Sequence, residues 1–333
     1  MTPADRAFQL VGGFRASQLV HAAAELKIPD LLAAGPMSSQ QLSAATGIDR
    51  GRLHRMLRGL VALDVLAEAE DGTFTNTDVG EAFREGGSRR PMAMMMIPHD
   101  YWSWGHFMET LRTGVTGQQL AHDGTLWDSL ERDPDFAVRF NQAMASNSEA
   151  VVEFVSREGD FANAQLIVDV GGGKGALVAG IVARHAHLKG IVCDLPAGLA
   201  EAPVYMATLG VQDRCTVTES DFFKAVPEGG DVYLLKDILH DWPDHDAVTI
   251  LQVCRRAMQP GALLLIVERT LPARVGHDPM DHNRILTDLH MMVLLGGRER
   301  TLDDFRDLFE KTGFSLTRHL PGQPFGIVEA VAV

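Results

Sequence analysis

The chain is poor in cysteine and in long apolar runs, and both shortages exclude classes of protein. Its three cysteines, Cys193, Cys215 and Cys254, form no C-x-x-C pair, and two of them lie in apolar runs. We expect reduced core cysteines in a cytoplasmic protein, and no metal site. No apolar run approaches the roughly 18 residues of a membrane span, and no charged-then-apolar leader opens the sequence, so neither a membrane partner nor secretion is expected.

Basic side chains and phosphate-binding motifs are also scarce. The 30 lysines and arginines are outnumbered by 44 acidic residues, which leaves a formal net charge of −14. Such a balance disfavours a polyanion as partner, so nucleic acid is not expected. Neither G-x-G-x-x-G nor G-x-x-x-x-G-K-[ST] occurs in the sequence. Phosphate cradling is therefore not predicted.

A glycine turn lies in the middle of the chain. The apolar run LIVDV over residues 166–170 breaks into glycines, among them Gly171, Gly173 and Gly175, and then resumes as a helical pattern over 176–182. This order is typical of a buried parallel strand that feeds a helix. Glycine has no Cβ and tolerates positive φ, so a ligand can approach the backbone closely. The turn therefore indicates a nucleotide or nucleoside site.

Two acidic residues near this turn indicate which ligand it binds. Asp169 stands two residues before the first glycine, where its carboxylate would repel a pyrophosphate but could accept hydrogen bonds from an ammonium group. Asp194 ends the next apolar run, over residues 190–194, where a carboxylate can bind both hydroxyls of a ribose. Together these features suggest S-adenosylmethionine, which carries both an amino-acid tail and a ribose.

Alternating apolar runs and helical patterns predict the architecture of the C-terminal half. A length of 333 residues allows two domains at roughly 100–200 residues each. The first five expected strands have helical or connecting segments between them, which is typical of an α/β protein with a doubly wound, Rossmann-like parallel sheet. The expected strands are Ile167–Val170, Gly190–Asp194, Cys215–Thr218, Asp231–Leu235, Ala262–Glu268, Ser315–Arg318 and Gly326–Val331.

The N-terminal part is predicted to be mostly helical. Residues 8–26 carry apolar side chains on more than one helical face, so we expect a single helix there that is either core or, as we favour, a homodimer interface. Ser38 and Asp49 are caps of two further helices, and residues 66–77 alternate like a small hairpin. Two helices and a hairpin make a winged-helix unit.

This unit supports a rival function, a ligand-sensing transcription regulator. Arg50, Arg52, Arg55 and Arg58 cluster on the helix that would contact DNA. The alternative is a solvated helix face, or one paired with acids of a partner subunit. The net charge and the large C-terminal domain favour that alternative. Retardation of bulk DNA at low salt would distinguish the regulator from an enzyme.

A segment rich in methionine and aromatic rings, residues 92–108, is a candidate for part of an acceptor pocket. Such helices are more often plain core, but aromatic rings offer flat apolar walls and methionine adapts to irregular shapes. If the acceptor is a flat aromatic molecule, this segment supplies part of the lining. The side chains expected there are Trp102, Trp104, Phe107 and Met108.

One helix is expected to connect the two domains, over residues 134–156. Four of its side chains fall at i, i+1, i+4 and i+8, which places them on one face. That face can meet both acceptor and cofactor. The four residues are Phe140, Asn141, Met144 and Ser148.

Polar side chains gather at the carboxyl ends of the expected strands, the edge at which such sheets bind ligands. Lys236 closes one strand and His240 follows one helical turn later, so both can face one cleft. Histidine is the side chain best suited to take a proton near neutral pH. A lone histidine is more often structural, but the other polar residues expected at this edge favour a catalytic role for His240. The polar residues are Asp194, Asp221, Lys236, His240 and Glu268.

Five short motifs follow one another along the chain. They are VDVGGGKG over residues 168–175, DLP over 194–196, SDFF over 220–223, LKDILHDW over 235–242 and GGRERT over 296–301. Together they resemble the S-adenosylmethionine-dependent O-methyltransferases of plant phenolic and bacterial polyketide metabolism. The glycine motif alone is a weak signal, whereas the last two motifs are a strong one. The resemblance implies a winged-helix dimerisation and substrate-lid domain over 1–150 and a class I methyltransferase domain over 151–333.

The resemblance also implies which residues bind the cofactor, whose product is S-adenosylhomocysteine. Asp194 with Leu195 would contact the ribose and the adenine edge, and Lys236 with Ser148 would hold the amino-acid end. The aromatic ring of Trp242 would stack nearby. With Asp169 from the argument above, the expected cofactor-binding residues are Ser148, Asp169, Gly171, Gly173, Asp194, Leu195, Asp221, Phe222, Lys236 and Trp242.

By the same resemblance, His240 matches the general base that removes a phenolic proton, and Glu268 and Glu299 match two acids that flank and orient it. A sulfonium methyl group is a strong electrophile, so the reaction needs a deprotonated oxygen placed in line with it. A carboxylate behind the imidazole fixes its tautomer. The positions expected to bind an aromatic acceptor are Trp104, Phe107, Met108, Phe140, Asn141, Met144 and Asp241.

A third function stays open on the same scaffold. Members of this fold family also perform decarboxylation, hydroxylation or ring closure without ordinary methyl transfer, and fold does not fix function. The presence of His240, Glu268 and Glu299 favours methyl transfer, in the biosynthesis of a secondary metabolite. The sequence does not choose among a hydroxylated polycycle, a small phenol and an amine as acceptor.

Overall fold

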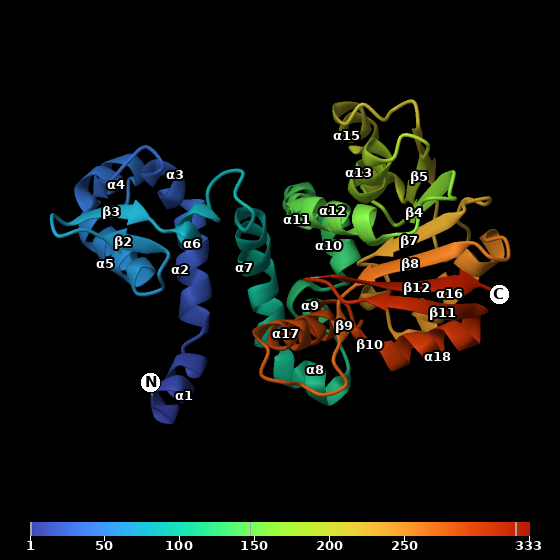
Figure 1. The fold of residues 1–333 in the computed structure, drawn as a ribbon. Coiled ribbons are helices and arrows are strands. Elements are labelled where there is room, and N and C mark those ends of the chain that lie inside the picture. Colours follow the sequence, from blue (N-terminus) through green and yellow to red (C-terminus); the bar gives the residue numbers. More distant parts are fainter. Residues whose placement is uncertain (1, 147, 324) are drawn as a thin grey trace. The chain divides into compact units, whose positions relative to one another are not determined.

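Two compact units make up the chain in the computed structural model, which describes residues 2–146, 148–323 and 325–333, the side chains of 145, 146 and 148–150 excepted (Figure 1). The first unit comprises Met1–Trp102 and Trp127–Ser146, and the second comprises Ser103–Leu126 and Asn147–Val333. Residues 103–126, placed in the N-terminal domain by the sequence analysis, therefore pack with the C-terminal unit.

The N-terminal segment forms two helices, α1 (Pro3–Val11) and α2 (Phe14–Glu25). The expectation of a single helix over 8–26 is therefore wrong. Gly12 and Gly13 separate the two helices, since glycine is a poor helix former and Gly12 serves as the C-cap of α1. Helix α1 buries none of its side chains against the rest of the chain, and it leaves several large apolar side chains exposed.

The winged-helix elements are present in the first unit. The side chains of Ser38 and Asp49 accept hydrogen bonds from backbone N–H groups of the helices that follow them, as expected of N-caps. The predicted hairpin is an antiparallel pair, and a third short strand extends it to a sheet of order β1-β3-β2. The elements are α3 (Ile28–Leu32), β1 (Met37–Ser38), α4 (Ser39–Thr46), α5 (Arg50–Val61), β2 (Leu66–Glu68), β3 (Thr73–Asn76) and α6 (Asp78–Glu81).

Helix α5 divides into an apolar and a basic face. Leu53, Leu57 and Leu60 recur at helical spacing and are fully buried in the core of the first unit. The four arginines that the regulator hypothesis invoked are exposed. The structure thus places them on a solvated helix face.

Truncation of a core leucine should destabilise the first unit selectively. We expect Leu57→Ala to lower the free energy of unfolding by about 2–5 kcal/mol, because it leaves a cavity among buried side chains. Amide hydrogen exchange should then accelerate in α4 and α5 more than in the sheet of the second unit. Leu63→Ala, at a position that is 37% exposed, is the control and should have little effect. Equal acceleration in both units would show that the two cores unfold as one.

Among the described residues, six helices lie between α6 and the glycine turn along the chain, and a seventh follows the turn. The helix expected over 134–156 corresponds to α11 and α12, and residue 147 between them lies outside the described residues. Within the described parts of the chain, no helix has both the length and the apolar character needed to cross a membrane. The helices after α6 are α7 (Arg90–Gly105), α8 (Phe107–Thr113), α9 (Gly117–His122), α10 (Leu126–Arg132), α11 (Pro134–Ser146), α12 (Ser148–Glu158) and α13 (Ala176–Arg184).

A seven-stranded sheet of order β11-β12-β8-β7-β4-β5-β6 forms the second unit. The five predicted strands from β4 to β8 are parallel, which confirms the Rossmann-like core. Strand β12 pairs antiparallel with both β8 and β11, so the sheet is not parallel throughout. The strands are β4 (Leu166–Val170), β5 (Lys189–Asp194), β6 (Cys215–Glu219), β7 (Val232–Lys236), β8 (Leu263–Glu268), β11 (Phe314–Leu320) and β12 (Gly326–Ala332).

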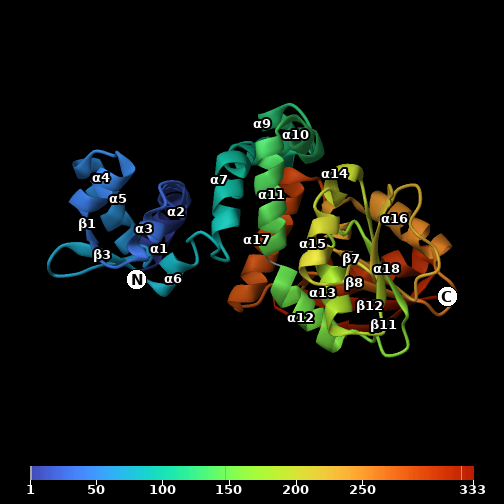
Figure 2. The same cartoon turned by 90° about the horizontal axis from the view of Figure 1, so that it is seen from above.

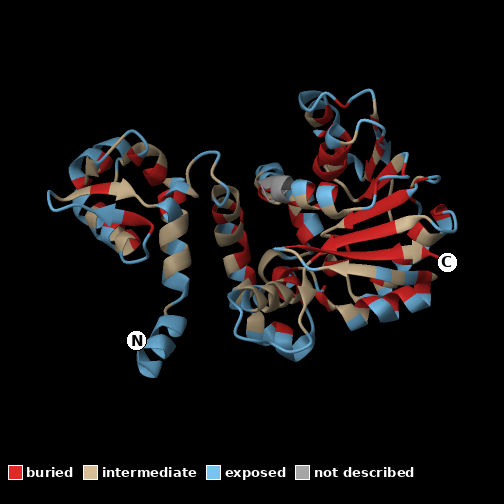
Figure 3. Cartoon of the chain, in the orientation of Figure 1, coloured by how far each residue is buried: buried red, intermediate tan, exposed pale blue. Residues whose placement is uncertain are grey.

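Helices cover both faces of this sheet (Figure 2). One buried cluster joins the sheet to α12, α13 and the short helices α14 (Pro196–Leu199) and α15 (Ala202–Thr208). The other joins it to α16 (Asp244–Ala257) and α18 (Leu302–Thr312). The central strands are consequently buried along most of their length (Figure 3). Two buried faces explain why these strands read as continuous apolar runs.

Besides α18, three elements that the sequence did not predict lie after β8. They are the two-residue strand β9 (Thr270–Leu271), helix α17 (Pro279–Leu294) and the two-residue strand β10 (Arg300–Thr301). Strands β9 and β10 pair in parallel, with Arg300 opposite Thr270. This pairing brings the GGRERT motif beside the end of β8.

Candidate functional site

The glycine turn after β4 has the backbone geometry that the sequence predicted. Gly171 and Gly173 have φ values of 68° and 55°, in the region that favours glycine. A Cβ at Gly171 would lie 2.5 Å from Cδ1 of Ile238, so a larger residue here would adopt a strained φ and displace that side chain. At Gly173 nothing described lies within 4 Å of the Cβ position. There is therefore open space next to the backbone of Gly173.

Asp194 borders this open space at the end of β5. Its Oδ2 accepts a hydrogen bond from the N–H of Gly173 at 2.8 Å, and its Oδ1 accepts one from the N–H of Leu195 at 2.7 Å. Burial raises the pKa of Asp194, and the two backbone donors oppose that rise. The carboxylate thus fixes the glycine turn, and the exposed Leu195 follows directly.

Asp169 lies beneath the turn rather than at its opening. It is almost fully buried, and its Oδ2 accepts a hydrogen bond from the N–H of Val178 in α13 at 3.3 Å. Burial raises its pKa to about 7. A Cβ at Gly172 would approach this carboxylate to 2.7 Å. Asp169 therefore supports the turn from within, and its predicted contact with an ammonium group stays a prediction.

The lysine at the end of β7 has an acidic neighbour. Lys236 Nζ lies 2.5 Å from Oδ2 of Asp237 and 5.1 Å from the ring centre of Phe325. Asp237 has a φ of 52°, and its Oδ1 lies 3.4 Å from Arg269. Burial would raise the pKa of Asp237, but Lys236, His240 and Arg269 together lower it. Lys236 is thus part of a charged cluster, and its contact with the cofactor stays a prediction.

The aromatic residues expected around the adenine form one cluster. The rings of Phe223 and Trp242 meet edge to face at 4.7 Å, and Phe222 lies 6.2 Å from Trp242. The side chain of Asp221 accepts a hydrogen bond from the N–H of Phe223 and pairs with Lys224 at 2.9 Å. These contacts hold the SDFF and LKDILHDW motifs together.

His240 lies in a 3₁₀ turn, Leu239–Asp241, that follows β7 closely. Its ring is buried, and Nδ1 donates a hydrogen bond to Oε1 of Glu299 at 2.9 Å, since a carboxylate can only accept. The second ring nitrogen, Nε2, lies 3.3 Å from Oδ1 of Asp241 and 3.8 Å from Oδ1 of Asp237. Glu299 thus fixes the tautomer of the imidazole and leaves Nε2 to exchange a proton.

Acidic neighbours dominate the electrostatics of the imidazole. Burial lowers the pKa of His240, but Glu299, Asp241 and Asp237 outweigh burial and raise it to about 10. Burial raises the pKa of Asp241 to about 7, against the effect of His240. The ligand-free protein therefore favours an imidazolium at neutral pH.

Glu268 acts on the backbone of the turn. Its Oε1 accepts hydrogen bonds from the N–H groups of Ile238, Leu239 and His240, at 3.2, 2.7 and 3.2 Å. The resemblance implied that Glu268 and Glu299 both flank the histidine. Here Glu299 contacts the ring, whereas Glu268 holds the main chain that carries it.

Two of the expected acceptor residues lie against α17 within the second unit. Trp104 Nε1 donates a hydrogen bond to Nδ1 of His290 at 2.9 Å, and the rings of Trp104 and Phe107 stack at 5.3 Å. Two residues earlier on α17, Oδ1 of Asp288 accepts a hydrogen bond from the N–H of Glu299 at 2.9 Å. Helix α17 thus connects these aromatic rings to the segment that carries Glu299.

Other expected residues are not brought to this site by the described contacts. Phe140, Asn141 and Met144 lie on α11 in the first unit, where Phe140 contacts Phe136. Met108 is exposed on α8. The side chain of Ser148 lies outside the described residues. The roles of these five residues stay predictions.

Four charged residues at the site were missed by the assignment of roles from the sequence. Asp237 and Arg300 stand inside quoted motifs, so their position beside His240 and Glu299 was a usable signal. Arg269, which lies 3.7 Å from Oε1 of Glu299, follows Glu268 directly. Asp288 lies on a helix that was not predicted, and no sequence signal identified it.

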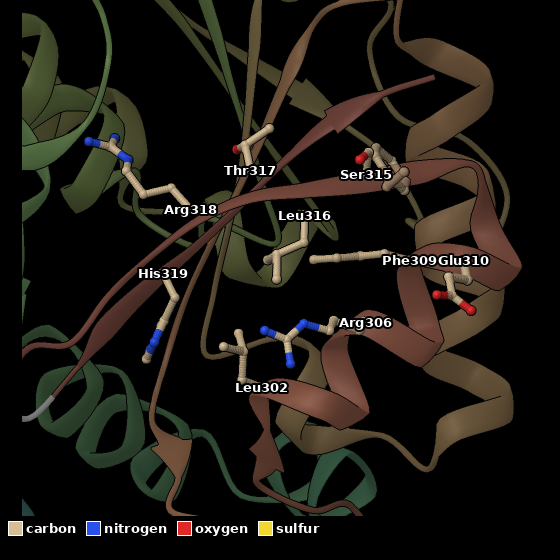
Figure 4. A pocket seen from close by; sticks show the side chains of 10 residues that line it. Leu302, Arg306, Phe309, Glu310, Ser315, Leu316, Thr317, Arg318 and His319 are labelled. Carbon is tan, nitrogen blue, oxygen red and sulfur yellow. The ribbon is translucent and has the colours of Figure 1, made fainter.

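A separate groove of about 540 Å³ lies between α18 and β11 (Figure 4). Its side chains include Leu302, Arg306, Phe309, Leu316 and His319. None of the described residues that line it is a predicted site residue, so the groove is separate from the site around His240. Among the described residues, no group of three or more His, Cys, Asp or Glu side chains has the arrangement of a metal site.

Two family models match the sequence, one for each part of the chain. An O-methyltransferase dimerisation domain matches residues 8–86, and an O-methyltransferase domain matches residues 104–315. The phenazine O-methyltransferase PhzM of Lysobacter antibioticus is 37% identical over 325 residues, which cover 97% of this chain and 94% of that protein.

Solved structures show the same relationship. The crystal structure of LaPhzM has a TM-score of 0.93 at 35% sequence identity and covers 100% of both chains. An O-methyltransferase from neocarzinostatin biosynthesis, in complex with S-adenosylmethionine and 2-hydroxy-5-methyl naphthoic acid, has a TM-score of 0.83 at 28% identity and covers 96% of each chain. These similarities extend over both units.

Proposed function

Because this chain belongs to the O-methyltransferase family, we propose that it methylates a phenolic hydroxyl of an aromatic small molecule, with S-adenosylmethionine as donor and His240 as general base. The observation that carries the proposal is the buried hydrogen bond between His240 and Glu299, which leaves Nε2 of the imidazole to take the phenolic proton. A family resemblance alone would not identify the base.

The glycine turn and its borders fit the donor. Open space beside Gly173 admits a ligand to the backbone, and the carboxylate of Asp194 lies at that opening. The aromatic cluster around Trp242 offers an apolar surface for the adenine ring of the donor. When bound, the donor supplies an electrophilic methyl group on a positively charged sulfur. The residues proposed to hold it are Ser148, Asp169, Gly171, Gly173, Asp194, Leu195, Asp221, Phe222, Lys236 and Trp242.

The electrostatics around His240 suit removal of a phenolic proton. A phenol has an ordinary pKa near about 10, so a base of similar pKa accepts its proton with little free-energy cost. Glu299 stabilises the imidazolium that forms. A cation bound nearby would lower the pKa of His240 and favour the neutral ring that can act as base.

Replacement of Asp194 should weaken donor binding far more than it affects the fold of the sheet. We expect Asp194→Ala to raise the Kd for S-adenosylhomocysteine roughly 10- to 100-fold, because a hydrogen-bonding carboxylate at the ribose position is lost. Titration calorimetry measures this change. Asp213→Ala, in the exposed turn before β6, is the control. An unchanged Kd in Asp194→Ala would place the ribose elsewhere.

Aromatic side chains support an aromatic acceptor. Trp104 and Phe107 stack on each other beside α17, and we propose that they line the acceptor pocket together with Asp241. Phe140, Asn141, Met144 and Met108 are proposed to complete it. Relatives from antibiotic biosynthesis support a role in secondary metabolism.

The first unit is proposed to form a homodimer and to cover the acceptor. Its match to a dimerisation domain supports this assembly, and Phe8, Leu10, Val11 and Phe14 leave apolar surface exposed at the start of the chain. We propose residues 1–150 and 151–333 as the functional division and the cytoplasm as the location. Sedimentation equilibrium of the purified chain tests the dimer.

The alternatives are less well supported. Membership of the O-methyltransferase family does not favour a DNA-binding regulator, and the arginines of α5 lie on a solvated face. The buried His240–Glu299 pair favours methyl transfer over decarboxylation or hydroxylation on this scaffold. Incubation with methyl-labelled S-adenosylmethionine and a panel of phenols, naphthols and hydroxyphenazines tests the proposal. Release of S-adenosylhomocysteine with a gain of one CH₂ in the acceptor supports it.

A further inference from the structure

Arg300 is a fully buried arginine beside the catalytic turn. Its Nη1 donates a hydrogen bond to the carbonyl of Leu239 at 2.7 Å, and its Nη2 donates one to the carbonyl of Trp242 at 2.9 Å. Nε and Nη2 also bond to Oδ1 of Asp244, at 3.1 and 2.9 Å. One guanidinium therefore spans the 3₁₀ turn that carries His240.

The turn is held from both sides by buried ionisable groups. Glu268 accepts hydrogen bonds from three of its N–H groups, and Arg300 donates to the carbonyls at its two ends. The carbonyl of His240 accepts a further bond from the N–H of Arg298 at 2.9 Å. With these bonds made, the turn has little freedom to slide or rotate.

Arg300 is also the neighbour in sequence of Glu299. Side chains of successive residues in an extended segment point to opposite sides, so Glu299 reaches the imidazole while Arg300 reaches the backbone of the same turn. The parallel pairing of β10 with β9 places Arg300 opposite Thr270, just after the end of β8, and Glu299 directly precedes β10. Two successive residues thus position His240: Glu299 holds its ring, and Arg300 holds the main chain of its turn.

Stability alone gives no reason for a cation at this place. A buried ion pair is often no more stabilising than apolar residues of similar volume, because desolvation offsets the attraction. A guanidinium, in contrast to an ammonium, can donate in several fixed directions at once. The contacts of Arg300 use that property, since its three nitrogens reach two carbonyls and a carboxylate.

We propose that Arg300 is a positioning residue that holds the His240 turn in register with Glu299, an inference that rests on the proposed role of His240 as base. Displacement of a catalytic group by about 1 Å can cost roughly 10²-fold in rate. Loss of Arg300 should therefore lower kcat while the donor site around Gly173 and Asp194 remains intact.

Three variants of the full-length protein test this role, with kcat expressed per active site counted by bound S-adenosylhomocysteine. We expect Arg300→Gln to lower kcat roughly 10²-fold with little change in the KM of the donor. Arg300→Lys should show a smaller loss, because lysine keeps the positive charge but lacks the several fixed donor directions of a guanidinium. Arg298→Gln is the matched control, since Arg298 contacts the same Asp244 but is 44% exposed and bonds to the turn only through its backbone.

The pH profile separates positioning from a merely structural role. If the turn shifts away from Glu299, the pKa of His240 falls, so the rise of kcat/KM with pH should move to lower pH in Arg300→Gln. Faster amide exchange at residues 238–242 should accompany this shift of the pH profile.

An unchanged kcat per active site and pH profile, or an equal loss in Arg298→Gln, would overturn the proposal. If Arg300→Gln does not fold, the same comparison is made with Arg300→Lys, and wild-type kcat and pH profile in that variant would overturn it. Full activity in His240→Ala would instead refute the proposed base.

Discussion

His240→Ala should lower turnover roughly 10²–10⁴-fold while the affinity for S-adenosylmethionine stays within a few-fold of the wild type. Nε2 of the imidazole is the nitrogen that can take the phenolic proton, because Nδ1 is hydrogen-bonded to Glu299. The glycine turn and Asp194 are fixed by their own hydrogen bonds, which do not involve His240. Steady-state kinetics and titration calorimetry on the same preparation measure the two effects.

Two comparisons sharpen this prediction. His245→Ala is a control, because that histidine lies five residues away with a side chain that is 79% exposed. Acidic phenols, which are already ionised at the assay pH, should be methylated by His240→Ala with a much smaller deficit, since they need no base. An equal loss of donor affinity and turnover would remove His240 from the role of base. So would a deficit that is the same for every acceptor.

Glu299→Gln should lower the maximal rate roughly 10²–10⁴-fold and also shift the pH dependence of kcat/KM. In the wild type, the carboxylates around His240 raise its pKa to about 10, so activity rises with pH as the imidazole loses its proton. Removal of the Glu299 charge lowers that pKa toward the ordinary value of 6.5. The rise in activity should therefore begin at lower pH in the variant.

The sign of this shift gives a sharp test. At pH 7 a larger fraction of the variant than of the wild type carries a neutral imidazole, so the deficit of the variant should be smaller at pH 7 than at higher pH. Glu310→Gln, at an exposed position on α18, should change neither rate nor profile. A profile for Glu299→Gln that coincides with the wild type after scaling would show that Glu299 does not set the charge of His240.

The sequence predicted the parts of the site that local pattern determines. The glycine turn follows from an apolar strand that breaks into glycines, and its positive φ values are those that glycine tolerates. The parallel core follows from alternation of apolar runs and helices. The expected strand Ile167–Val170 differs from β4 by one residue. Such features depend on neighbours in the sequence, so a single chain contains the information.

Contacts between segments that are distant in the sequence were harder to predict. The imidazole of His240 meets Glu299 across 59 positions, and the main chain of its turn meets Glu268 across about 28. The polar strand ends placed His240 and Glu268 at one edge of the sheet, but only the resemblance connected His240 with Glu299. It did not distinguish a contact with the ring from one with the backbone. Arg300 stood in a recognised motif without a role, because burial of an arginine at a turn is a property of packing that no spacing in the sequence reveals.

At the N-terminus, by contrast, a local pattern led to a wrong prediction. Apolar spacing over residues 8–26 predicted one helix, but Gly12 and Gly13 end α1 and begin α2. Periodicity was given more weight than the low helix propensity of two adjacent glycines. The apolar side chains of α1 are nevertheless exposed, in keeping with the predicted interface.

The most direct test of the central claim is the stoichiometry of methyl transfer with a matched pair of acceptors. One acceptor is a naphthol or hydroxyphenazine that the enzyme methylates, and the other is the same ring with its hydroxyl already converted to a methyl ether. We predict that one S-adenosylhomocysteine is released per methyl ether formed from the first acceptor, and that none is released with the second. Label on carbon or nitrogen, or product formed without consumption of the donor, would contradict it.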